Sequence, residues 1–420
     1  MGKTITEKIF SLKSGMNVKA GDVIVADIDS IMSNDASGPL TIEYFYKMNA
    51  NRVTHPERIA FILDHYVPCP NDKVAALQQS VFDFGNKYGI TVVPTGEGIA
   101  HQVFDEMGYV KPVSLIVGGD SHSTTYGYLN CLGIGIGSSD LAMAINTGKL
   151  WFKVPQTIKI NLFGKPSPGI GGKEIALHII SALGSNGGNY KSIEFDGDGM
   201  KYLTIDDRKT ICNQMAECGA KCSVMPFDAI TKVYCNERGF DFSEGISPDS
   251  DCEYIAIHNI DLSIIKYLIA QPHNPSNSIE LSELVGLRID MVLIGTCTNG
   301  RIEDFRIVDE IIKHNPKPFA VETLIVPASR TIYREMIQEG IADRLLERHA
   351  IILPPGCGPC CGSSPGVPRN NFNVLSTANR NFIGRMGNTS AKIYLTSPIV
   401  AATSALTGYI TDPMEVIQYG

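Results

Sequence analysis

The sequence predicts an α/β fold built on mostly parallel β-sheets. Short apolar runs typical of strands alternate along the chain with segments in which apolar residues recur at helical spacing, and the links are short. The chain of 420 residues is 44% hydrophobic and has no low-complexity tract, so all of it is expected to fold. Cysteines, histidines and aspartates follow several of the predicted strands. Ligands bind beyond the carboxyl ends of the strands in such sheets, and we expect the site there.

The pattern of elements predicts three α/β domains, over residues 1–154, 155–282 and 283–420. In the first domain, helices are expected over 4–11, 40–48 and 73–88, and strands over 22–28, 58–63, 90–93 and 113–117. In the second domain, helices are expected over 172–183 and 204–219, and strands over 157–162 and 191–195. In the third domain, helices are expected over 301–314 and 330–347, and strands over 291–294, 323–326 and 350–353.

Three stretches rich in turn-forming residues are expected to be irregular. The polar stretch 33–39 reads as a loop that leads into a helix, and the glycines of 132–138 as a packed turn. Residues 271–283, which contain Pro, Asn and Ser, have the composition of a linker between the second and third domains.

Charge and hydropathy exclude several classes of protein. The net charge is −8 and no Lys/Arg cluster is present, which argues against binding of nucleic acid. No apolar run approaches the roughly 20 residues that a membrane-spanning helix needs. The N-terminus lacks the apolar core of a signal peptide. We therefore expect a cytoplasmic protein whose 11 cysteines are reduced.

Three cysteines stand on Gly-rich loops directly after predicted strands: Cys297, Cys357 and Cys360. Three convergent thiolates suit an iron–sulfur cluster or zinc. Two alternatives stay open. The motif Cys-Gly-Pro-Cys is also that of thiol-redox proteins, although the residues after it are a poor start for the long helix that such proteins have. A closed structural zinc site would add Cys361, although adjacent cysteines rarely both point at one metal.

Acidic residues and histidines follow strands of the first predicted domain in the same way. Asp64 and His65 come directly after one strand, His101 after the next, and Asp120 and His122 after a third. A carboxylate beside a histidine orients the imidazole and sets its pKa for acid–base work. Ordinary hydrogen-bonded loop histidines are the alternative for each one taken singly.

Two arginines follow the cysteine loop, Arg380 and Arg385. A guanidinium group binds a carboxylate through two parallel hydrogen bonds, so the pair suits a ligand rich in carboxylates. A surface salt bridge is the alternative for each.

Seven segments, taken in order and at their spacing, resemble the large subunit of the aconitase family, of the isopropylmalate isomerase type in which that subunit is a separate chain. The segments are Phe61-Ile-Leu-Asp-His65, Gly98-Ile-Ala-His-Gln102, Gly119-Asp-Ser-His-Ser-Thr-Thr125, Ile211-Cys-Asn213 with Ala216-Glu217, Ile294-Gly-Thr-Cys-Thr-Asn-Gly-Arg301, Cys357-Gly-Pro-Cys360 and Asn379-Arg-Asn-Phe-Ile-Gly-Arg385. The resemblance spans nearly the whole chain. It implies an aconitase-like fold of three α/β/α domains around a central crevice that binds a cluster.

The resemblance also implies roles for individual residues. A 4Fe–4S cluster would be held by Cys297, Cys357 and Cys360, and its fourth iron, free of protein ligands, would act as a Lewis acid. The implied acid–base pairs are Asp64 with His65, Asp120 with His101, and Glu217 with His122, and His65 would donate the proton to the departing hydroxyl. Ser121, Asn379, Arg380 and Arg385 would bind the substrate, with Asn213 and Asn299 around them.

The implied reaction removes water from a 2-hydroxy acid and adds it back at the neighbouring carbon. The first expected substrate is 2-isopropylmalate, on the route to leucine, and the alternatives are homoaconitate, dimethylmaleate and citraconate or methylmalate. Pro39 stands where aconitases have a substrate-binding glutamine, which argues against citrate. Single-chain aconitases have a fourth domain that completes the site. The resemblance therefore implies a separate small subunit, without which this chain is expected to be inactive. Cys361 and the residues Gly362 to Pro365 depart from the family pattern.

Overall fold

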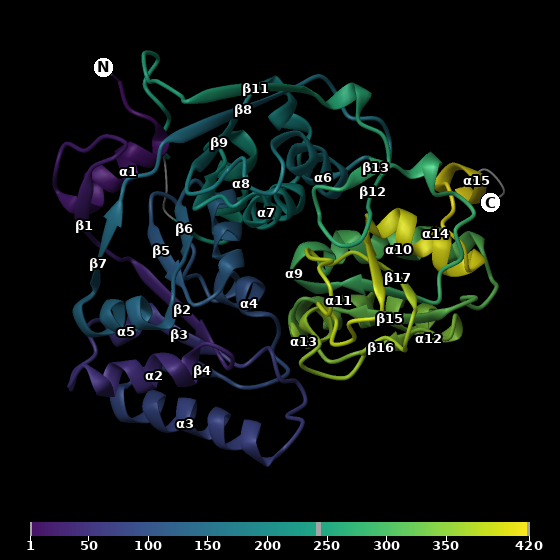
Figure 1. Ribbon diagram of the computed structural model, residues 1–420, viewed down its shortest axis with the longest axis horizontal. Helices are drawn as coiled ribbons and strands as arrows, with labels where there is room; N and C mark the ends of the chain where they lie inside the picture. Colours follow the sequence, from purple (N-terminus) through teal and green to yellow (C-terminus); the bar gives the residue numbers. More distant parts are fainter. Residues whose placement is uncertain (1, 241–244, 418–420) are drawn as a thin grey trace.

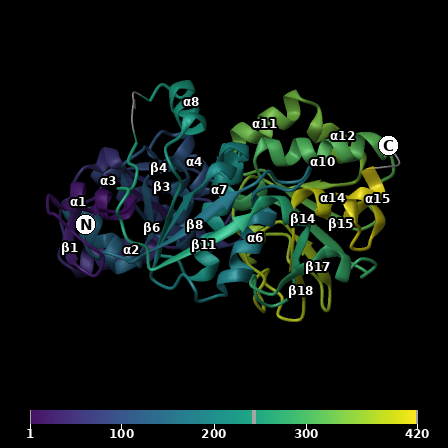
Figure 2. The same cartoon turned by 90° about the horizontal axis from the view of Figure 1, so that it is seen from above.

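The computed structural model describes residues 2–240 and 245–417, and within them the chain forms four β-sheets. Figure 1 shows the sheets of the N-terminal part, in purple, blue and teal, on one side of the molecule. The sheet of the C-terminal part, in green and yellow, lies on the other side, and Figure 2 shows the same two halves from above. The fold is mixed α/β with mostly parallel strands, as the sequence predicts.

The first sheet has five parallel strands in the order β4-β3-β2-β5-β6. Its strands are β2 (Ser30–Asn34), β3 (Ile59–Ile62), β4 (Thr91–Val93), β5 (Leu115–Gly118) and β6 (Leu132–Gly135). Both faces are covered. Ile31 and Phe61 pack with the helices α2 (Gly38–Lys47), α3 (Asp72–Tyr88) and α5 (Ser138–Thr147). Met32, Ala60 and Ile62 pack on the other side, against α4 (Ala100–Glu106) and the 3₁₀ helix η2 (Ser121–Leu129). Burial on both faces explains why these strands are almost wholly apolar.

The second sheet has four parallel strands in the order β10-β9-β8-β11. They are β8 (Thr157–Phe163), β9 (Ser192–Asp196), β10 (Cys222–Val224) and β11 (Ala256–Asp261). The helices α6 (Gly172–Leu183) and α7 (Ile205–Gln214) share a hydrophobic core with this sheet and with the inner face of the first sheet. That shared core fixes α7 next to the ends of the first sheet's strands.

The third sheet has seven strands in the order β13-β12-β18-β17-β14-β15-β16. They are β12 (Leu268–Ala270), β13 (Ser278–Glu280), β14 (Met291–Gly295), β15 (Glu322–Val326), β16 (Ile351–Ile352), β17 (Asn373–Ser376) and β18 (Lys392–Leu395). The five strands from β18 to β16 are parallel, and β12 and β13 are antiparallel. Four helices pack on one face: α10 (Ile302–His314), α11 (Arg330–Gln338), α12 (Ile341–Glu347) and α14 (Pro398–Thr407).

The remaining elements are short. A two-stranded antiparallel sheet joins β1 (Val23–Asp27) to β7 (Lys149–Lys153). The other helices are α1 (Ile5–Ser14), α8 (Ala229–Glu237), α9 (Thr296–Asn299), α13 (Gly358–Cys361) and α15 (Pro413–Ile417). The other 3₁₀ helices are η1 (Pro56–Arg58), η3 (Asp198–Tyr202), η4 (Met215–Cys218), η5 (Leu262–Ile264) and η6 (Leu281–Glu283). None of the helices in the described part of the chain has the length and apolar character needed to cross a membrane.

The structure corrects several of the predicted elements. The helix expected over 330–347 is two helices, because Gly340 takes a left-handed φ of 71° between them. The helix expected over 204–219 continues after α7 only as the 3₁₀ helix η4. Gly133 and Gly135 of the predicted turn 132–138 belong to β6, and Gly137 directly precedes α5. A Cβ on Gly133 would lie 2.1 Å from the carbonyl oxygen of Ser123, so this strand needs glycine where η2 crosses it.

Two stretches expected to be irregular contain strand residues. Ser33 and Asn34, at the start of the predicted loop 33–39, are the last residues of β2. The predicted linker 271–283 contains β13. The third sheet therefore takes up strands that precede residue 283. The division of the chain into domains at 154 and 282 stays a prediction.

A buried ion pair joins α4 to α7. Asp105 accepts a hydrogen bond from Lys209 Nζ at 2.8 Å and another from Arg238 Nη1 at 2.9 Å. The Lys209 ammonium also lies over the rings of Tyr128 and Tyr234, 4.8 and 5.4 Å from their centroids. Burial disfavours the charge of Asp105, but Lys209 and Arg238 outweigh it and lower the pKa of Asp105.

Replacement of Lys209 by Met is expected to lower the free energy of unfolding of the metal-free chain by about 3 kcal/mol, because it leaves a buried carboxylate short of a partner. Denaturant unfolding measures this. The pKa of Asp105 is lower in the folded chain, so its contribution is present above the unfolded pKa of about 3.9 and is lost as the pH falls through the folded value. Lys159→Met is the control, because Lys159 pairs at 2.6 Å with the exposed Asp196, and we expect a change below about 1 kcal/mol. Equal losses in the two variants would contradict the prediction.

Candidate active site

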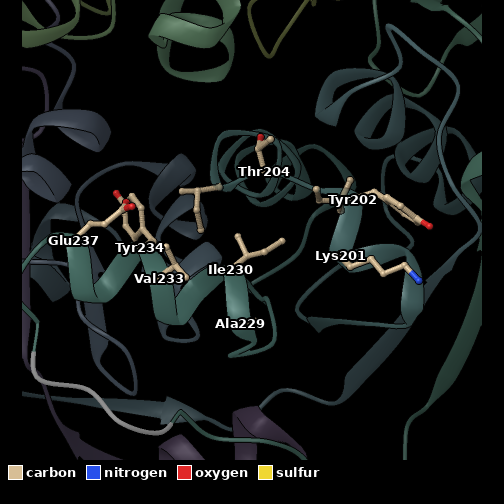
Figure 3. A pocket seen from close by; sticks show the side chains of 10 residues that line it. Lys201, Tyr202, Thr204, Ala229, Ile230, Val233, Tyr234 and Glu237 are labelled. Carbon is tan, nitrogen blue, oxygen red and sulfur yellow. The ribbon is translucent and has the colours of Figure 1, made fainter.

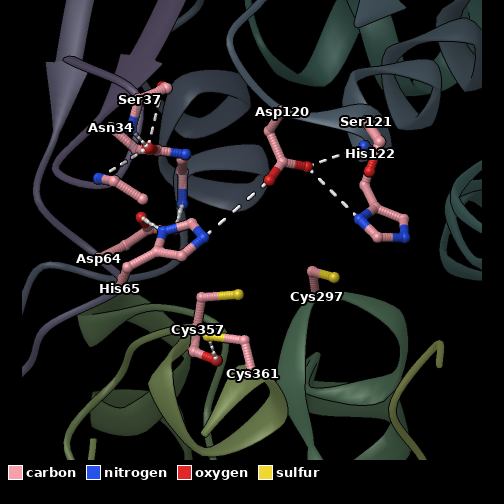
Figure 4. A network of polar contacts seen from close by, with 12 residues as sticks. Asn34, Ser37, Asp64, His65, Asp120, Ser121, His122, Cys297, Cys357 and Cys361 are labelled. Carbon is pink, nitrogen blue, oxygen red and sulfur yellow. Dashed lines mark hydrogen bonds and ion pairs between the residues drawn. The ribbon is translucent and has the colours of Figure 1, made fainter. Parts of the chain in front are cut away.

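Most of the residues predicted to do chemistry follow the carboxyl ends of strands in the first and third sheets, whereas Glu217 lies on η4, which follows α7. Figure 4 shows Asp64, His65 and Asp120 on one side, facing Cys297 and Cys357 on the other. Two hydrogen bonds join the two sides directly: Cys357 N donates to the carbonyl oxygen of Asp64 at 2.7 Å, and Ser363 Oγ to that of His65 at 2.6 Å. The ends of parallel strands thus bring together groups that are more than 200 residues apart in the sequence.

His65 is held by the carboxylate that precedes it. Its Nδ1 is hydrogen bonded to Asp64 Oδ1 at 2.7 Å, and the other Asp64 oxygen accepts the backbone N–H of Ala100 at 2.7 Å. Burial disfavours the charged ring, but the Asp64 carboxylate outweighs it and raises the pKa of His65 to about 10. His65 Nε2 lies 4.0 Å from Asp120 Oδ2. The ring is therefore protonated at neutral pH, which suits a proton donor.

Asp120 connects the histidines of the site. Its Oδ1 is hydrogen bonded to His101 Nε2 at 2.9 Å and accepts the backbone N–H of His122 at 2.8 Å. The Nδ1 atom of the His122 ring lies 3.4 Å from the same oxygen. Burial alone would favour the neutral acid, but the hydrogen bonds from the two histidines hold the pKa of Asp120 well below its usual value. Asp120 is thus a carboxylate with a histidine on each side.

Glu217 forms the third carboxylate–histidine pair and also contacts the C-terminal half. Its Oε1 is hydrogen bonded to His122 Nε2 at 2.9 Å and accepts from Arg380 Nε at 2.8 Å. Burial opposes the charge, but the hydrogen bond to His122 prevails and lowers the pKa of Glu217. Arg380 Nη2 donates to Ser121 Oγ at 2.9 Å. The structure therefore brings Ser121, His122, Glu217 and Arg380 together.

Cys297 is buried on α9, where β14 ends at Gly295. Gly295 has a φ of 126°, and a Cβ there would lie 2.0 Å from the carbonyl oxygen of Val326, so the turn needs glycine. Two side-chain amides donate to the Cys297 sulfur, Asn213 Nδ2 at 3.4 Å and Asn379 Nδ2 at 3.3 Å. Burial raises the pKa of the Cys297 thiol to about 12. A metal bound here must therefore displace a proton.

Cys357 and Cys360 stand on the loop after β16, where α13 makes a single turn. Arg385 Nη2 donates to the Cys360 sulfur at 3.4 Å, and Arg385 Nε is buried with no hydrogen-bond partner among the residues that the structure describes. N–H groups directed at the sulfurs are what a thiolate-bound iron–sulfur cluster needs around it. The donor set of Cys297, Cys357 and Cys360, with Asn213, Asn379 and Arg385 beside it, fits such a cluster.

Cys361 lies beside Cys357 and His65, and the ligand atoms of these three residues come within 4.8 Å of one another. Its sulfur lies 3.0 Å from Ser363 Oγ and 3.6 Å from the carbonyl oxygen of Cys357. A tetrahedral zinc site needs four sulfurs about 3.8 Å apart. Among the described residues, neither the four cysteines nor Cys297, Cys357 and Cys360 alone have ligand atoms that all lie within 4.8 Å of one another. The closed zinc site is not formed.

The thiol-redox alternative fails on the helix that follows the motif. A thioredoxin-like site needs a long helix after its two cysteines. Here α13 ends at Gly362, which has a left-handed φ of 68°. A Cβ on Gly362 would meet the backbone of Gly387 at 2.3 Å. The loop is therefore closed against the arginine-bearing segment and does not start a helix.

Two buried charged residues at this site, Asp35 and Lys173, are not among those that the sequence predicts. Asp35, at the end of β2, accepts the backbone N–H groups of Asp64, His65 and Tyr66 at 3.1, 2.9 and 3.2 Å and so shapes their turn. Asp35 directly follows a strand, as the predicted site residues do, but the polar residues Ser30, Ser33 and Asn34 hide that strand from an apolar pattern. Lys173, in the first turn of α6, is 1% exposed. Burial lowers the pKa of Lys173 to about 8, and the thiolates of Cys297 and Cys360 act in the opposite direction.

Asn299 was expected next to the substrate-binding residues, and its contacts lie elsewhere in the site. Its Nδ2 donates to Asp304 Oδ1 at 2.9 Å, at the start of α10. The adjacent Arg301 donates its backbone N–H to the other Asp304 oxygen at 3.0 Å and its Nη1 to the carbonyl oxygen of Cys297 at 3.0 Å. Asn299 therefore belongs to the frame that holds the Cys297 turn.

A cavity of about 510 Å³ lies away from these residues, between η3 and α8 (Figure 3). Its walls are mainly apolar, with Ile205, Ile230 and Val233, and it contains Lys201 and Glu237. None of the predicted site residues lines it. Its size alone does not make it an active site, since it has no converging groups for chemistry.

Comparison with known proteins shows which family this chain resembles. The model of the aconitase family (aconitate hydratase) matches residues 7–288 and 282–408. The 3-isopropylmalate dehydratase large subunit 1 of Thermotoga maritima is 42% identical over 421 residues, covering 99% of this chain and 100% of that one. Large subunit 2 of Archaeoglobus fulgidus is 40% identical, covering 99% and 100%. Large subunit 1 of Methanopyrus kandleri is 38% identical, covering 98% and 99%.

One solved structure supports the fold. Aconitase X of Thermococcus kodakaraensis, in its holo form, superposes with a TM-score of 0.51 over 89% of each chain. Its sequence is only 15% identical, so the likeness is one of fold alone. The predicted aconitase-like fold is confirmed.

Proposed function

Because the chain belongs to the aconitase family, we propose that it is the large subunit of a hydro-lyase that isomerises 2-isopropylmalate to 3-isopropylmalate by removal and re-addition of water. Relatives that match along their full length bear the name 3-isopropylmalate dehydratase large subunit. One observation carries the proposal: three carboxylate–histidine pairs lie on one side of the site. Figure 4 shows Asp64, His65 and Asp120 of these pairs facing Cys297 and Cys357. The pathway served would be leucine biosynthesis.

The cofactor proposed is one 4Fe–4S cluster, held by Cys297, Cys357 and Cys360. When bound, such a cluster with one iron free of protein ligands supplies a Lewis acid for a hydroxyl and a carboxylate. The amides of Asn213 and Asn379 and the guanidinium of Arg385 would stabilise the thiolates through the N–H···S contacts already described. N–H groups directed at the sulfurs in this way favour anionic sulfur.

His65 is proposed as the proton donor to the departing hydroxyl. Its Nδ1 is bonded to Asp64, which leaves Nε2 free to point into the site next to Asp120. A proton on Nε2 can pass to the leaving oxygen, and the Asp64 carboxylate stabilises the ring throughout. In the other two pairs, the carboxylates of Asp120 and Glu217 would orient the rings of His101 and His122 and balance their positive charge.

Arg380 and Arg385, with Ser121 and Asn379, are proposed to bind the substrate carboxylates. Arg380 uses Nε and Nη2 for Glu217 and Ser121, and its Nη1 makes no hydrogen bond to the residues described. That free N–H group, fixed by two protein contacts, can donate to a carboxylate with little loss of side-chain entropy.

A small subunit is the proposed partner. The relatives that match along their full length are named as large subunits, which implies a small one. The base that removes a carbon-bound proton would then come from the small subunit. The lone chain is expected to bind the cluster and to turn over no substrate.

The test is anaerobic purification, alone and with a 3-isopropylmalate dehydratase small subunit, followed by iron and sulfide assays and hydration assays. About four iron and four sulfide per chain are expected. Isopropylmaleate should be hydrated faster than homoaconitate, dimethylmaleate or citraconate, and only with the small subunit present. A preference for another acid would replace the proposed substrate. A chain that holds no cluster after reconstitution would overturn the proposal.

A further inference from the structure

The ammonium group of Lys173 is buried without a carboxylate partner. Among the described residues, it donates hydrogen bonds only to the backbone carbonyl oxygens of Thr377 and Ala378, at 3.0 and 2.6 Å. No Asp or Glu oxygen in the described part of the chain comes within 4.0 Å of it, unlike Lys209, which pairs with Asp105 at 2.8 Å. Buried charges in proteins are normally paired, because an unpaired one is costly to remove from water. Lys173 therefore lacks its counter-charge.

The position of Lys173 in its helix adds to the cost of its unpaired positive charge. It lies in the first turn of α6, a helix of 12 residues, where the helix dipole favours anions over cations. Neither helix propensity nor packing explains a buried ammonium at this place. Glu174 and Asp304 favour its charge, but neither forms an ion pair with it in the described part of the chain, so a closer anion is still to be supplied.

The surroundings of Lys173 identify that anion. The carbonyl groups that it contacts directly precede Asn379, whose amide donates to the Cys297 sulfur. Burial lowers the pKa of Lys173, and the sulfurs of Cys297 and Cys360, followed by the carboxyl groups of Glu174 and Asp304, act in the opposite direction. Both cysteines are proposed ligands of the cluster. A 4Fe–4S cluster held by three thiolates carries a net negative charge.

We infer that Lys173 is the buried counter-charge of the iron–sulfur cluster and that it stabilises the bound cluster and raises its reduction potential. The inference rests on the proposed function only in requiring that the chain bind such a cluster. Lys173 contacts the loop of Asn379 rather than the reacting atoms, so it acts on the cluster through its charge and through the position of that loop. Positive charge and hydrogen bonds near a cluster are the means by which a protein sets its potential.

The test compares Lys173→Gln and Lys173→Met with the parent chain after anaerobic reconstitution. The Gln variant keeps an N–H donor and the Met variant keeps the length, so the loss of charge is common to both. Three quantities are measured: the rate at which iron is lost to a chelator, the midpoint potential of the cluster, and the thermal midpoint of the metal-free chain. We expect iron loss about tenfold faster and a more negative midpoint potential in both variants.

The matched control is Lys209→Met, which removes a buried lysine that already has a carboxylate partner. It should lower the thermal midpoint of the metal-free chain and leave the potential of the cluster unchanged. The Lys173 variants should instead shift the midpoint potential of the cluster and change the thermal midpoint of the metal-free chain little. If the Lys173 variants keep the parent's potential, or lose iron only in proportion to a lowered thermal midpoint, the inference is overturned. If the parent chain binds no cluster, the proposed function itself has failed.

Discussion

A Cys357→Ser variant is expected to lose its iron–sulfur cluster and, with it, all hydration activity above background. The serine hydroxyl is a poor ligand for iron compared with a thiolate, and only two of the three proposed cysteines remain. The backbone of the loop should be unaffected, because Cys357 N still donates to the carbonyl oxygen of Asp64. Iron and sulfide content and the visible spectrum of the anaerobically reconstituted chain measure the loss.

Cys361→Ser is a control four residues further along the same loop. The Cys361 sulfur contacts Ser363 and backbone carbonyl groups rather than the amides that surround Cys297. This variant should keep its cluster and most of its activity. A result in which Cys361→Ser loses the cluster and Cys357→Ser keeps it would assign the ligand to the other cysteine.

A His65→Asn variant is expected to retain the cluster and to lose between about 10²- and 10⁴-fold in kcat, the usual contribution of a general acid. Asn keeps a hydrogen-bonding group near Asp64 but carries no transferable proton. KM should change much less than kcat, because the proposed substrate-binding arginines are untouched. Steady-state hydration of isopropylmaleate with the small subunit present gives both constants.

His55→Asn controls for the loss of a histidine beside a carboxylate. His55 Nδ1 lies 3.1 Å from Glu57, but the pair is exposed on the 3₁₀ helix η1. Its kcat should match that of the parent. A His65 variant with unchanged kcat would remove His65 from the proton-donor role, whatever the state of the cluster.

The sequence is a good guide to this fold where strands are apolar and helices are periodic. The predicted strand 58–63 corresponds to β3 (Ile59–Ile62), and the predicted helix 73–88 to α3 (Asp72–Tyr88), because burial on both faces or on one face leaves a clear pattern. The prediction failed at β6, where tight contact with η2 requires glycines that local propensity reads as a turn. The conformation of β6 depends on this tertiary contact, which no local sequence pattern reveals.

Some residues of the site could likewise be predicted from the sequence and others could not. Groups that follow recognisable strands, such as His65 and Cys297, could be predicted because parallel strands end on one edge of a sheet. Asp35 and Lys173 could not, because their importance lies in what buries them. A carboxylate that holds three consecutive backbone N–H groups, or a lysine without a counter-ion, is visible only once distant segments are placed together.

The separation of thiols and proton-transfer groups between two sheets has a consequence for biogenesis. The strands that carry His65, His101 and Asp120 are synthesised well before those that carry Cys297 and Cys357. The N-terminal sheets have cores of their own and can fold while the ribosome is still adding the cysteine-bearing segments. His65, His101 and Asp120 would then already be in place when the cysteine-bearing segments fold. Insertion of the cluster would be one of the last steps in the folding of this chain.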